Sequence, residues 1–154
     1  MKAGRLRRAE LAPAATFRLP VRVYYEDTDA SGVVYHASYL RYFERARTEW
    51  LRSMGLSQHS IHGSRGLVFT VANLEIDFLR AARLDDDLEV RVTIEPVRAA
   101  SLTFIQTLHR IGDPDTILTR ARVRVACVDA GTFRPRPLPE EFLQGVKEWH
   151  RNSR

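Results

Sequence analysis

The stretch Tyr25-Glu-Asp-Thr-Asp-Ala-Ser-Gly-Val-Val-Tyr-His-Ala-Ser-Tyr39 joins a short alternating segment to the longest amphipathic pattern of the chain. Its first half is rich in Asp, Ser and Gly, which favour turns. Beyond it, apolar residues recur every three or four positions as far as Met54, and Gly55 is a suitable residue to end a helix. We therefore expect a polar loop that leads into a long helix, with Ser38 as the N-cap.

Strand-like segments lie on both sides of this helix. Phe17–Tyr25 alternates apolar and polar residues, interrupted only by Pro20, which an edge strand tolerates. Further strands are expected at Leu67–Leu79, Leu88–Val97, Ser101–Ile111 and Thr116–Val128, and short helices at Ser57–His62 and Glu140–His150. A sheet with one apolar face must be covered, and the long helix is the only segment of sufficient length. The pattern predicts an α+β protein in which an antiparallel five-stranded sheet wraps around one long central helix.

Length and composition favour a single globular domain. The chain has 154 residues, of which 44% are hydrophobic and 28% charged, as is usual for a soluble domain. We expect residues 1–16 to form a flexible basic arm and residues 17–150 to form the domain. The net charge of +5 invites a nucleic-acid interpretation, but no recognition-helix, RNA-binding or zinc-finger motif accompanies it. We therefore predict no nucleic-acid partner.

The compartment is predicted from what the sequence does not contain. No apolar run approaches the roughly 18 residues that a membrane span needs, so we expect no stable membrane insertion. No apolar segment of the signal-peptide type follows the basic start. Cys127 is the single cysteine, so no intramolecular disulfide can form. Together these features predict a cytoplasmic protein.

The segment Val21–Trp50 resembles the signature of the hotdog-fold acyl-CoA thioesterases. It is similar to the 4-hydroxybenzoyl-CoA thioesterase family, and most closely to its YbgC branch, which is associated with the Tol-Pal cell-envelope system. The resemblance covers residues 17–145 and is most specific in the run Asp27-x-Asp-x-x-Gly-x-Val-Tyr-His36. Ser31 departs from it, because relatives often have glycine there. The resemblance implies the hotdog fold and an acyl-CoA thioester hydrolase that releases free coenzyme A and a carboxylic acid.

The resemblance also implies a set of site residues. Asp29 matches the catalytic aspartate of the family, and Tyr25 and His36 match positions that matter in the YbgC branch. The backbone N–H of His36 matches the donor that polarises the thioester carbonyl. The neighbouring loop residues are expected to bind the substrate: Gly32, Val33 and Tyr35.

The chemistry of a thioester explains why such residues are needed. A carboxylate can attack the carbonyl carbon directly or activate a water molecule, and we favour water activation by Asp29. Backbone N–H groups at a helix start can stabilise the negative charge that develops on the carbonyl oxygen. Each residue also has a structural interpretation: Asp29 as the cap of a turn, His36 as a histidine at a helix start, and Tyr25 as part of the core. Asp27 is expected to cap the loop.

Other candidate residues have weaker support. Glu44 lies on the polar face of the expected helix, although some hotdog thioesterases place their carboxylate on that helix. Cys127 is flanked by apolar residues, which disfavours a nucleophilic role, and His59 and His62 lack a metal-ligand pattern. We predict no metal and no cofactor, since coenzyme A is part of the substrate. Three alternating arginines could meet the phosphates of coenzyme A or form an exposed face of the sheet: Arg120, Arg122 and Arg124.

The remaining predictions concern partners and rival functions. The substrate is expected to be an acyl-CoA with a short aliphatic or small aromatic acyl group, with an acyl carrier protein as an alternative donor. A single sheet leaves two edge strands unpaired, so we predict a homo-oligomer, a dimer and then a tetramer. Two rival functions are a dehydratase acting on acyl thioesters and a non-catalytic acyl- or protein-binding module of the cell-envelope machinery.

Overall fold

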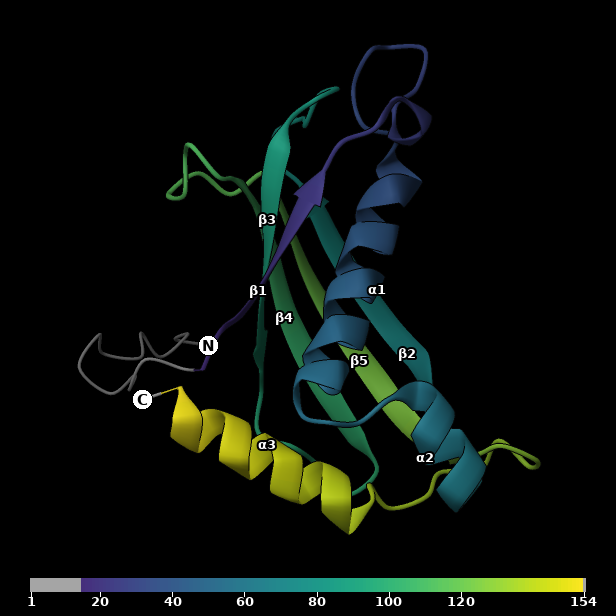
Figure 1. Ribbon diagram of the computed structural model, residues 1–154. Coiled ribbons are helices and arrows are strands. Elements are labelled where there is room, and N and C mark those ends of the chain that lie inside the picture. Colours follow the sequence, from purple (N-terminus) through teal and green to yellow (C-terminus); the bar gives the residue numbers. More distant parts are fainter. Residues whose placement is uncertain (1–14, 154) are drawn as a thin grey trace, which may run out of the picture.

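The computed structural model describes residues 15–153 and shows an antiparallel sheet with one long helix across it (Figure 1). The strands are β1 (Phe17–Arg22), β2 (Leu67–Phe78), β3 (Asp87–Ile94), β4 (Ser101–Arg110) and β5 (Thr119–Asp129). The α-helices are α1 (His36–Ser53), α2 (Gln58–Arg65) and α3 (Glu140–Asn152), and a short 3-10 helix, η1, spans Tyr25–Asp27. The strand order is β1-β3-β4-β5-β2, and every pair is antiparallel. The predicted α+β arrangement is confirmed.

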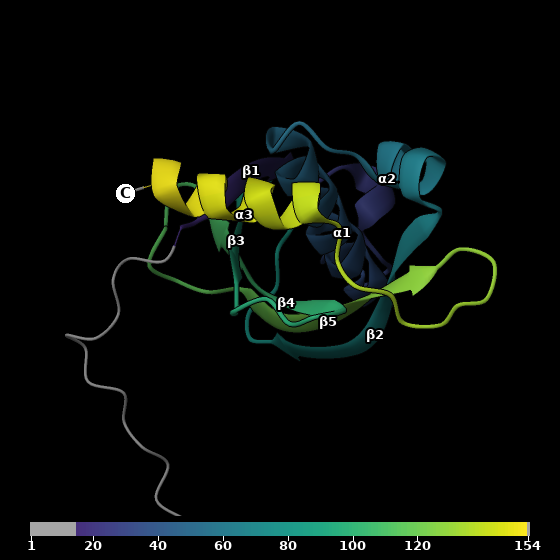
Figure 2. The same ribbon diagram turned by 90° about the horizontal axis from the view of Figure 1, so that it is seen from below.

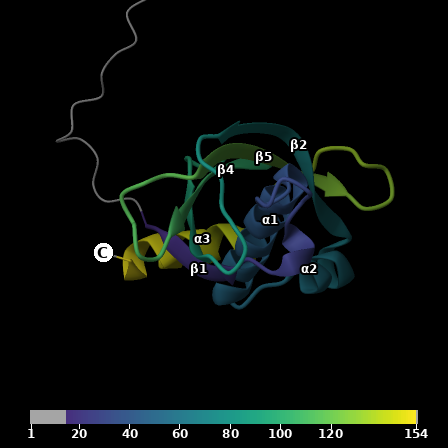
Figure 3. The ribbon, with the colours of Figure 1, turned by 90° about the horizontal axis from the view of Figure 1, so that it is seen from above.

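The sheet curves around α1, and the core lies between the two (Figures 2 and 3). Alternate residues of β5 face α1 and are buried: Thr119, Ala121, Val123, Val125 and Cys127. The helix buries one face against them, made of Tyr39, Tyr42, Phe43, Ala46, Trp50 and Leu51. Helix α3 closes one end of this core, because Phe142 and Trp149 pack edge-on against Trp50 at 5.9 and 5.5 Å between ring centroids.

Helix α1 begins at His36, three residues earlier than an N-cap at Ser38 would require, so that prediction is wrong. Tyr35 is the N-cap, and it makes no side-chain cap hydrogen bond. Its N–H donates to the carbonyl of Asp27 at 2.8 Å, and its own carbonyl accepts the N–H of Ser38 at 2.8 Å. The helix therefore starts where this hydrogen bond fixes the incoming chain, and Ser38 is buried within the first turn.

The other end of α1 follows the prediction. Gly55 has a φ of +76°, which glycine adopts without strain. Its N–H donates to the carbonyl of Arg52 at 2.9 Å, and the N–H of Leu56 donates to the carbonyl of Leu51 at 3.3 Å. These are the two hydrogen bonds of a Schellman motif, which satisfies carbonyls that the helix end would otherwise leave open.

The first strand is shorter than predicted. Strand β1 ends at Arg22, and the chain then turns into η1 instead of continuing to Tyr25. The turn is closed by Asp27, whose carboxylate accepts the N–H of Tyr24 at 2.9 Å. Of the predicted basic arm, residues 1–14 lie outside the described residues, and Ala15 is buried.

Candidate active site

The loop between η1 and α1 is a tight hairpin that contains Asp29. The N–H of Asp29 donates to the carbonyl of Val33, and the N–H of Gly32 donates to the carbonyl of Asp29, both at 3.0 Å. Thr28 and Val34 form an antiparallel bridge at its base. Gly32 has a φ of +79°, so the turn needs a residue that tolerates the left-handed conformation. The Asp, Ser and Gly composition of the segment predicted this turn.

A second segment holds the hairpin in place. Val34 donates its N–H to the carbonyl of Ala82 at 2.9 Å, and the N–H of Ala82 donates to the hydroxyl of Tyr39 at 3.0 Å. Val33 also forms a bridge with Arg83. Ala82 is fully buried, so both of its backbone groups are satisfied away from water. The chain that follows β2 therefore fixes the Asp29 hairpin against the start of α1.

The carboxylate of Asp29 is exposed but held by Ser31. Both the hydroxyl and the backbone N–H of Ser31 donate to Oδ1, the N–H at 2.8 Å. The hydroxyl of Ser31, then its N–H, hold the pKa of Asp29 below its usual value, and the nearby His36 acts in the same direction. Asp29 is therefore ionised at neutral pH.

Asp29 lies at an open pocket of about 330 Å³. The lining comes from the hairpin, the first turns of α1 and the end of β2, namely Asp29, Val33, Val34, His36, Tyr39, Phe78, Leu79, Arg80 and Ala81. The ring of His36 packs edge-on against Phe78, with 6.4 Å between ring centroids. The structure thus brings together Asp29, His36 and Val33 of the predicted site residues.

The start of α1 supplies hydrogen-bond donors at the same pocket. His36 is the first residue of α1, so its backbone N–H has no acceptor within the helix. The positive end of the helix dipole coincides with this position. The pocket therefore combines an ionised carboxylate with a helix N-terminus, which is what attack on a carbonyl compound requires.

Two predicted loop residues lie beside the pocket without lining it. Gly32 forms the turn, and the ring of Tyr35 packs against that of His36 at 4.4 Å between centroids. Tyr25 is 82% exposed, so the interpretation of Tyr25 as part of the core is wrong. Its backbone carbonyl supports the loop by accepting the N–H and hydroxyl of Thr28, at 3.1 and 2.7 Å.

The predicted capping role of Asp27 is confirmed. Asp27 is 5% exposed, its carboxylate accepts the N–H of Tyr24, and its carbonyl accepts the N–H of Tyr35. Four pocket residues at the end of β2 and just after it were not predicted from the sequence: Phe78, Leu79, Arg80 and Ala81. No spacing pattern links them to the hairpin at residues 28–34, and only the sheet topology brings the two segments together.

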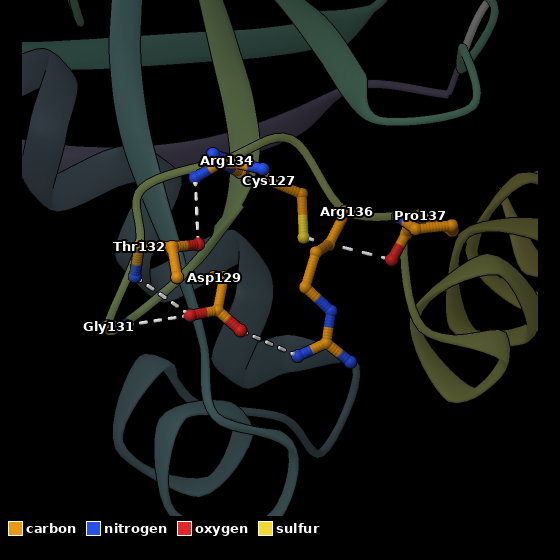
Figure 4. A network of polar contacts seen from close by, with 7 residues as sticks. All are labelled: Cys127, Asp129, Gly131, Thr132, Arg134, Arg136 and Pro137. Atoms are coloured by element: carbon orange, nitrogen blue, oxygen red, sulfur yellow. Dashed lines mark hydrogen bonds and ion pairs between the residues drawn. The ribbon is translucent and has the colours of Figure 1, made fainter.

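Asp129 is a second carboxylate with a lowered pKa, and its environment is structural. Figure 4 shows Oδ1 accepting the N–H groups of Thr132 and Gly131, each at 2.9 Å, and Oδ2 accepting from Arg136 at 3.1 Å. These hydrogen bonds lower its pKa. Both carboxylate oxygens of Asp129 thus accept hydrogen bonds from the loop after β5, whereas the hydrogen bonds from Ser31 reach only Oδ1 of Asp29. Cys127 nearby is buried, which raises the pKa of its thiol, and its Sγ lies 3.9 Å from the carbonyl of Pro137.

The remaining candidates lie away from the pocket. Glu44 is exposed and accepts the hydroxyl of Thr48 at 3.1 Å. His59 and His62 are exposed on α2, and residues 15–153 contain no cluster of three side chains suited to a metal ion. The arginines of β5 lie on the outer face of the sheet, where Arg122 forms two 3.0 Å hydrogen bonds with Glu95. No helix within the described chain is long and apolar enough to cross a membrane.

Comparisons of the sequence and of the structure with known proteins agree on one family. Residues 23–146 match the family described as the Thioesterase-like superfamily. The chain is 49% identical over 125 residues to the acyl-CoA thioesterase YbgC of Haemophilus influenzae, covering 81% of this chain and 90% of the relative. It is 46% identical over 132 residues to the acyl-CoA thioester hydrolase YbgC of Escherichia coli O6:H1, covering 86% and 96%.

A solved structure agrees with these relatives. The probable thioesterase from Bartonella henselae superimposes with a TM-score of 0.76 at 35% identity, covering 81% of this chain and 100% of that chain. The fold and the family resemblance predicted from the sequence are thus confirmed. On this evidence the chain belongs to the hotdog-fold members of the thioesterase-like superfamily, and within them to the YbgC branch.

Proposed function

We propose that this protein hydrolyses acyl-CoA thioesters, releasing free coenzyme A and a carboxylic acid. The observation that carries the proposal is one pocket lined by an ionised carboxylate, Asp29, and by the first residue of a helix, His36. The names of the YbgC relatives support the same activity. Each feature is needed at a different point in the reaction.

In the proposed mechanism the thioester carbonyl oxygen lies at the N-terminus of α1, where it accepts the N–H of His36. Asp29 takes a proton from a water molecule as that water attacks the carbonyl carbon, and a tetrahedral intermediate forms. The carbon–sulfur bond then breaks, and the coenzyme A thiolate leaves and takes up the proton. A single backbone donor to the intermediate is typically worth about 3 kcal/mol of transition-state stabilisation. The imidazole of His36 would orient the water or the thioester.

The walls of the pocket suggest how the substrate lies. Val33, Phe78 and Leu79 offer an apolar surface suited to a short aliphatic or small aromatic acyl group. Arg80 lines the pocket, and among the described residues it forms no ion pair, so it is available for a phosphate of coenzyme A. The exposed arginines on the outer face of the sheet are separated from this pocket by the sheet itself.

The rival functions fit the site less well. A dehydratase would pair a histidine with a carboxylate on the helix, but His36 is the first residue of α1 and Glu44 is two turns further on and exposed. A non-catalytic binding module would have no need of an ionised carboxylate beside a helix N-terminus. The association with the Tol-Pal system and the cytoplasmic location implied by the sequence stay predictions.

The first test is thiol release from a panel of acyl-CoAs that runs from acetyl to palmitoyl and includes benzoyl and 4-hydroxybenzoyl. We expect turnover to be highest for short aliphatic or small aromatic groups, because the pocket wall is small and apolar. The same acyl group on an acyl carrier protein should react with a lower kcat/KM. Absence of thiol release above the uncatalysed rate from every donor would instead support the binding-module interpretation.

The second test separates water activation from direct attack by Asp29. Single-turnover hydrolysis in oxygen-18 water should place the label in the released acid only, because water attacks the substrate carbon. Mass spectrometry measures the oxygen-18 content of the released acid and of the peptide that contains Asp29. Label in the Asp29 carboxylate would mean that an acyl anhydride formed and was opened by water, and the water-activation mechanism would be wrong.

We also propose that the protein is a homodimer built on the edge strand β2. The residues of β2 that face the side of the sheet carrying α1 are largely uncovered: Val71 is 51% exposed, Leu74 38% and Phe78 50%. A second copy that pairs β2 with β2 about a two-fold axis would cover both this apolar stripe and the unpaired strand edge. A tetramer of two such dimers is the predicted final state.

Such a dimer would bring the second subunit to the pocket. Phe78 belongs both to the exposed stripe of β2 and to the pocket lining. A partner seated on the stripe therefore borders the pocket, and the substrate would lie in a cleft that both subunits line.

The third test introduces a charge into the stripe. Val71→Asp should convert the dimer to a monomer and lower activity, because a carboxylate would be buried between the subunits. Sedimentation velocity at micromolar concentration measures the change. Ile111→Asp is the matched control, since Ile111 is 52% exposed in the turn after β4 and should leave the assembly intact. An unchanged sedimentation coefficient for Val71→Asp would exclude the β2 interface.

A further inference from the structure

The polar contacts of the Asp29 carboxylate involve a residue that has no role in the proposed mechanism. Ser31 lies two positions after Asp29 and donates both its hydroxyl and its N–H to Oδ1. Within residues 15–153 no side chain donates a hydrogen bond to Oδ2. The two oxygens of the carboxylate are therefore not equivalent.

We propose that Ser31 is a positioning residue for the hydrolytic carboxylate: its hydroxyl holds Oδ1 of Asp29 so that Oδ2 is the oxygen that acts in the reaction. This inference rests on the proposed thioesterase function. The backbone N–H of Ser31 would be present with any residue at this position, but the hydroxyl is specific to serine or threonine. Ser31 thus adds a second donor that a glycine in the same loop cannot provide.

The hydroxyl has two physical consequences. It restricts rotation of the carboxylate, because two donors from one residue bind the same oxygen. It also favours the ionised form, and it is the largest of the influences that lower the pKa of Asp29. Since the carboxylate accepts a proton during water activation, activity is lost as the pH falls through the pKa of Asp29. Removing the hydroxyl should move this loss to higher pH.

The test compares four proteins by two measurements. Carboxyl-carbon NMR follows the titration of Asp29 in the wild type, Ser31→Ala, Ser31→Thr and Thr28→Val, with the resonance assigned by its absence in Asp29→Asn. The acid limb of kcat/KM is recorded on the same proteins through the ultraviolet absorbance of the thioester. Ser31 is exposed and has a negative φ, so alanine and threonine both fit its backbone. Thr28→Val removes a hydroxyl from the same loop that contacts the carbonyl of Tyr25.

We expect Ser31→Ala to raise both the titration midpoint of Asp29 and the acid limb, and Ser31→Thr and Thr28→Val to leave both near the wild-type values. An unchanged midpoint in Ser31→Ala would overturn the inference while leaving the thioesterase proposal intact. If Ser31→Ala raises the titration midpoint of Asp29 but leaves the acid limb of kcat/KM unchanged, the inference is also overturned. Asp29 would then not be the group whose charge controls the reaction. Full activity in Asp29→Asn would contradict the proposed role of Asp29, whereas only an absence of thiol release from the wild type would contradict the proposed thioesterase function.

Discussion

Burial of one face of α1 against the curved sheet is the interaction on which the rest of the molecule depends. Tyr42, Phe43 and Trp50 are each 1% exposed or less, and burying one large side chain contributes about 1.5–3 kcal/mol. The position of the helix fixes its first residue, His36, and therefore the place where the Asp29 hairpin enters the pocket. One helix cannot cover five strands completely, which leaves the inner side of β2 exposed. The same packing thus defines both the site and the surface proposed for dimer formation.

Apolar packing alone would let the helix slide or rotate, and buried polar contacts prevent this. The amide of Gln106 on β4 is fully buried, donates to the carbonyl of Phe43 at 2.9 Å and accepts from Arg47 at 3.0 Å. Near the start of the helix, the hydroxyl of Tyr39 accepts the N–H of Ala82. A buried polar group left without a partner costs about 1–3 kcal/mol, so these contacts favour a single helix position. The site needs that precision, because a carboxylate and a helix N-terminus must reach one carbonyl group.

Local patterns in the sequence predicted most of the fold. Three- and four-residue spacing located α1, alternation located the strands, and Gly55 marked the end of the helix. The errors arose where hydrogen bonds within the loop compete with the preference of single residues. The backbone contact between Tyr35 and Asp27 starts the helix before Ser38 can cap it, and the turn closed by Asp27 shortens the first strand. The family resemblance supplied Asp29 and His36, which share the pocket, but the residues after β2 could not be found because their proximity depends on the sheet topology.

The central claim is that the exposed, ionised carboxylate of Asp29 carries out the hydrolysis, and the most direct measurement is the turnover number of Asp29→Asn. Circular dichroism and sedimentation should match the wild type, since Asp29 is exposed, while thiol release should fall close to the uncatalysed rate. Asp113→Asn makes the same chemical change in the turn after β4 and should keep wild-type turnover. A folded Asp29→Asn protein that retained more than about a tenth of kcat would contradict the account, because that loss corresponds to only about 1.4 kcal/mol of transition-state stabilisation.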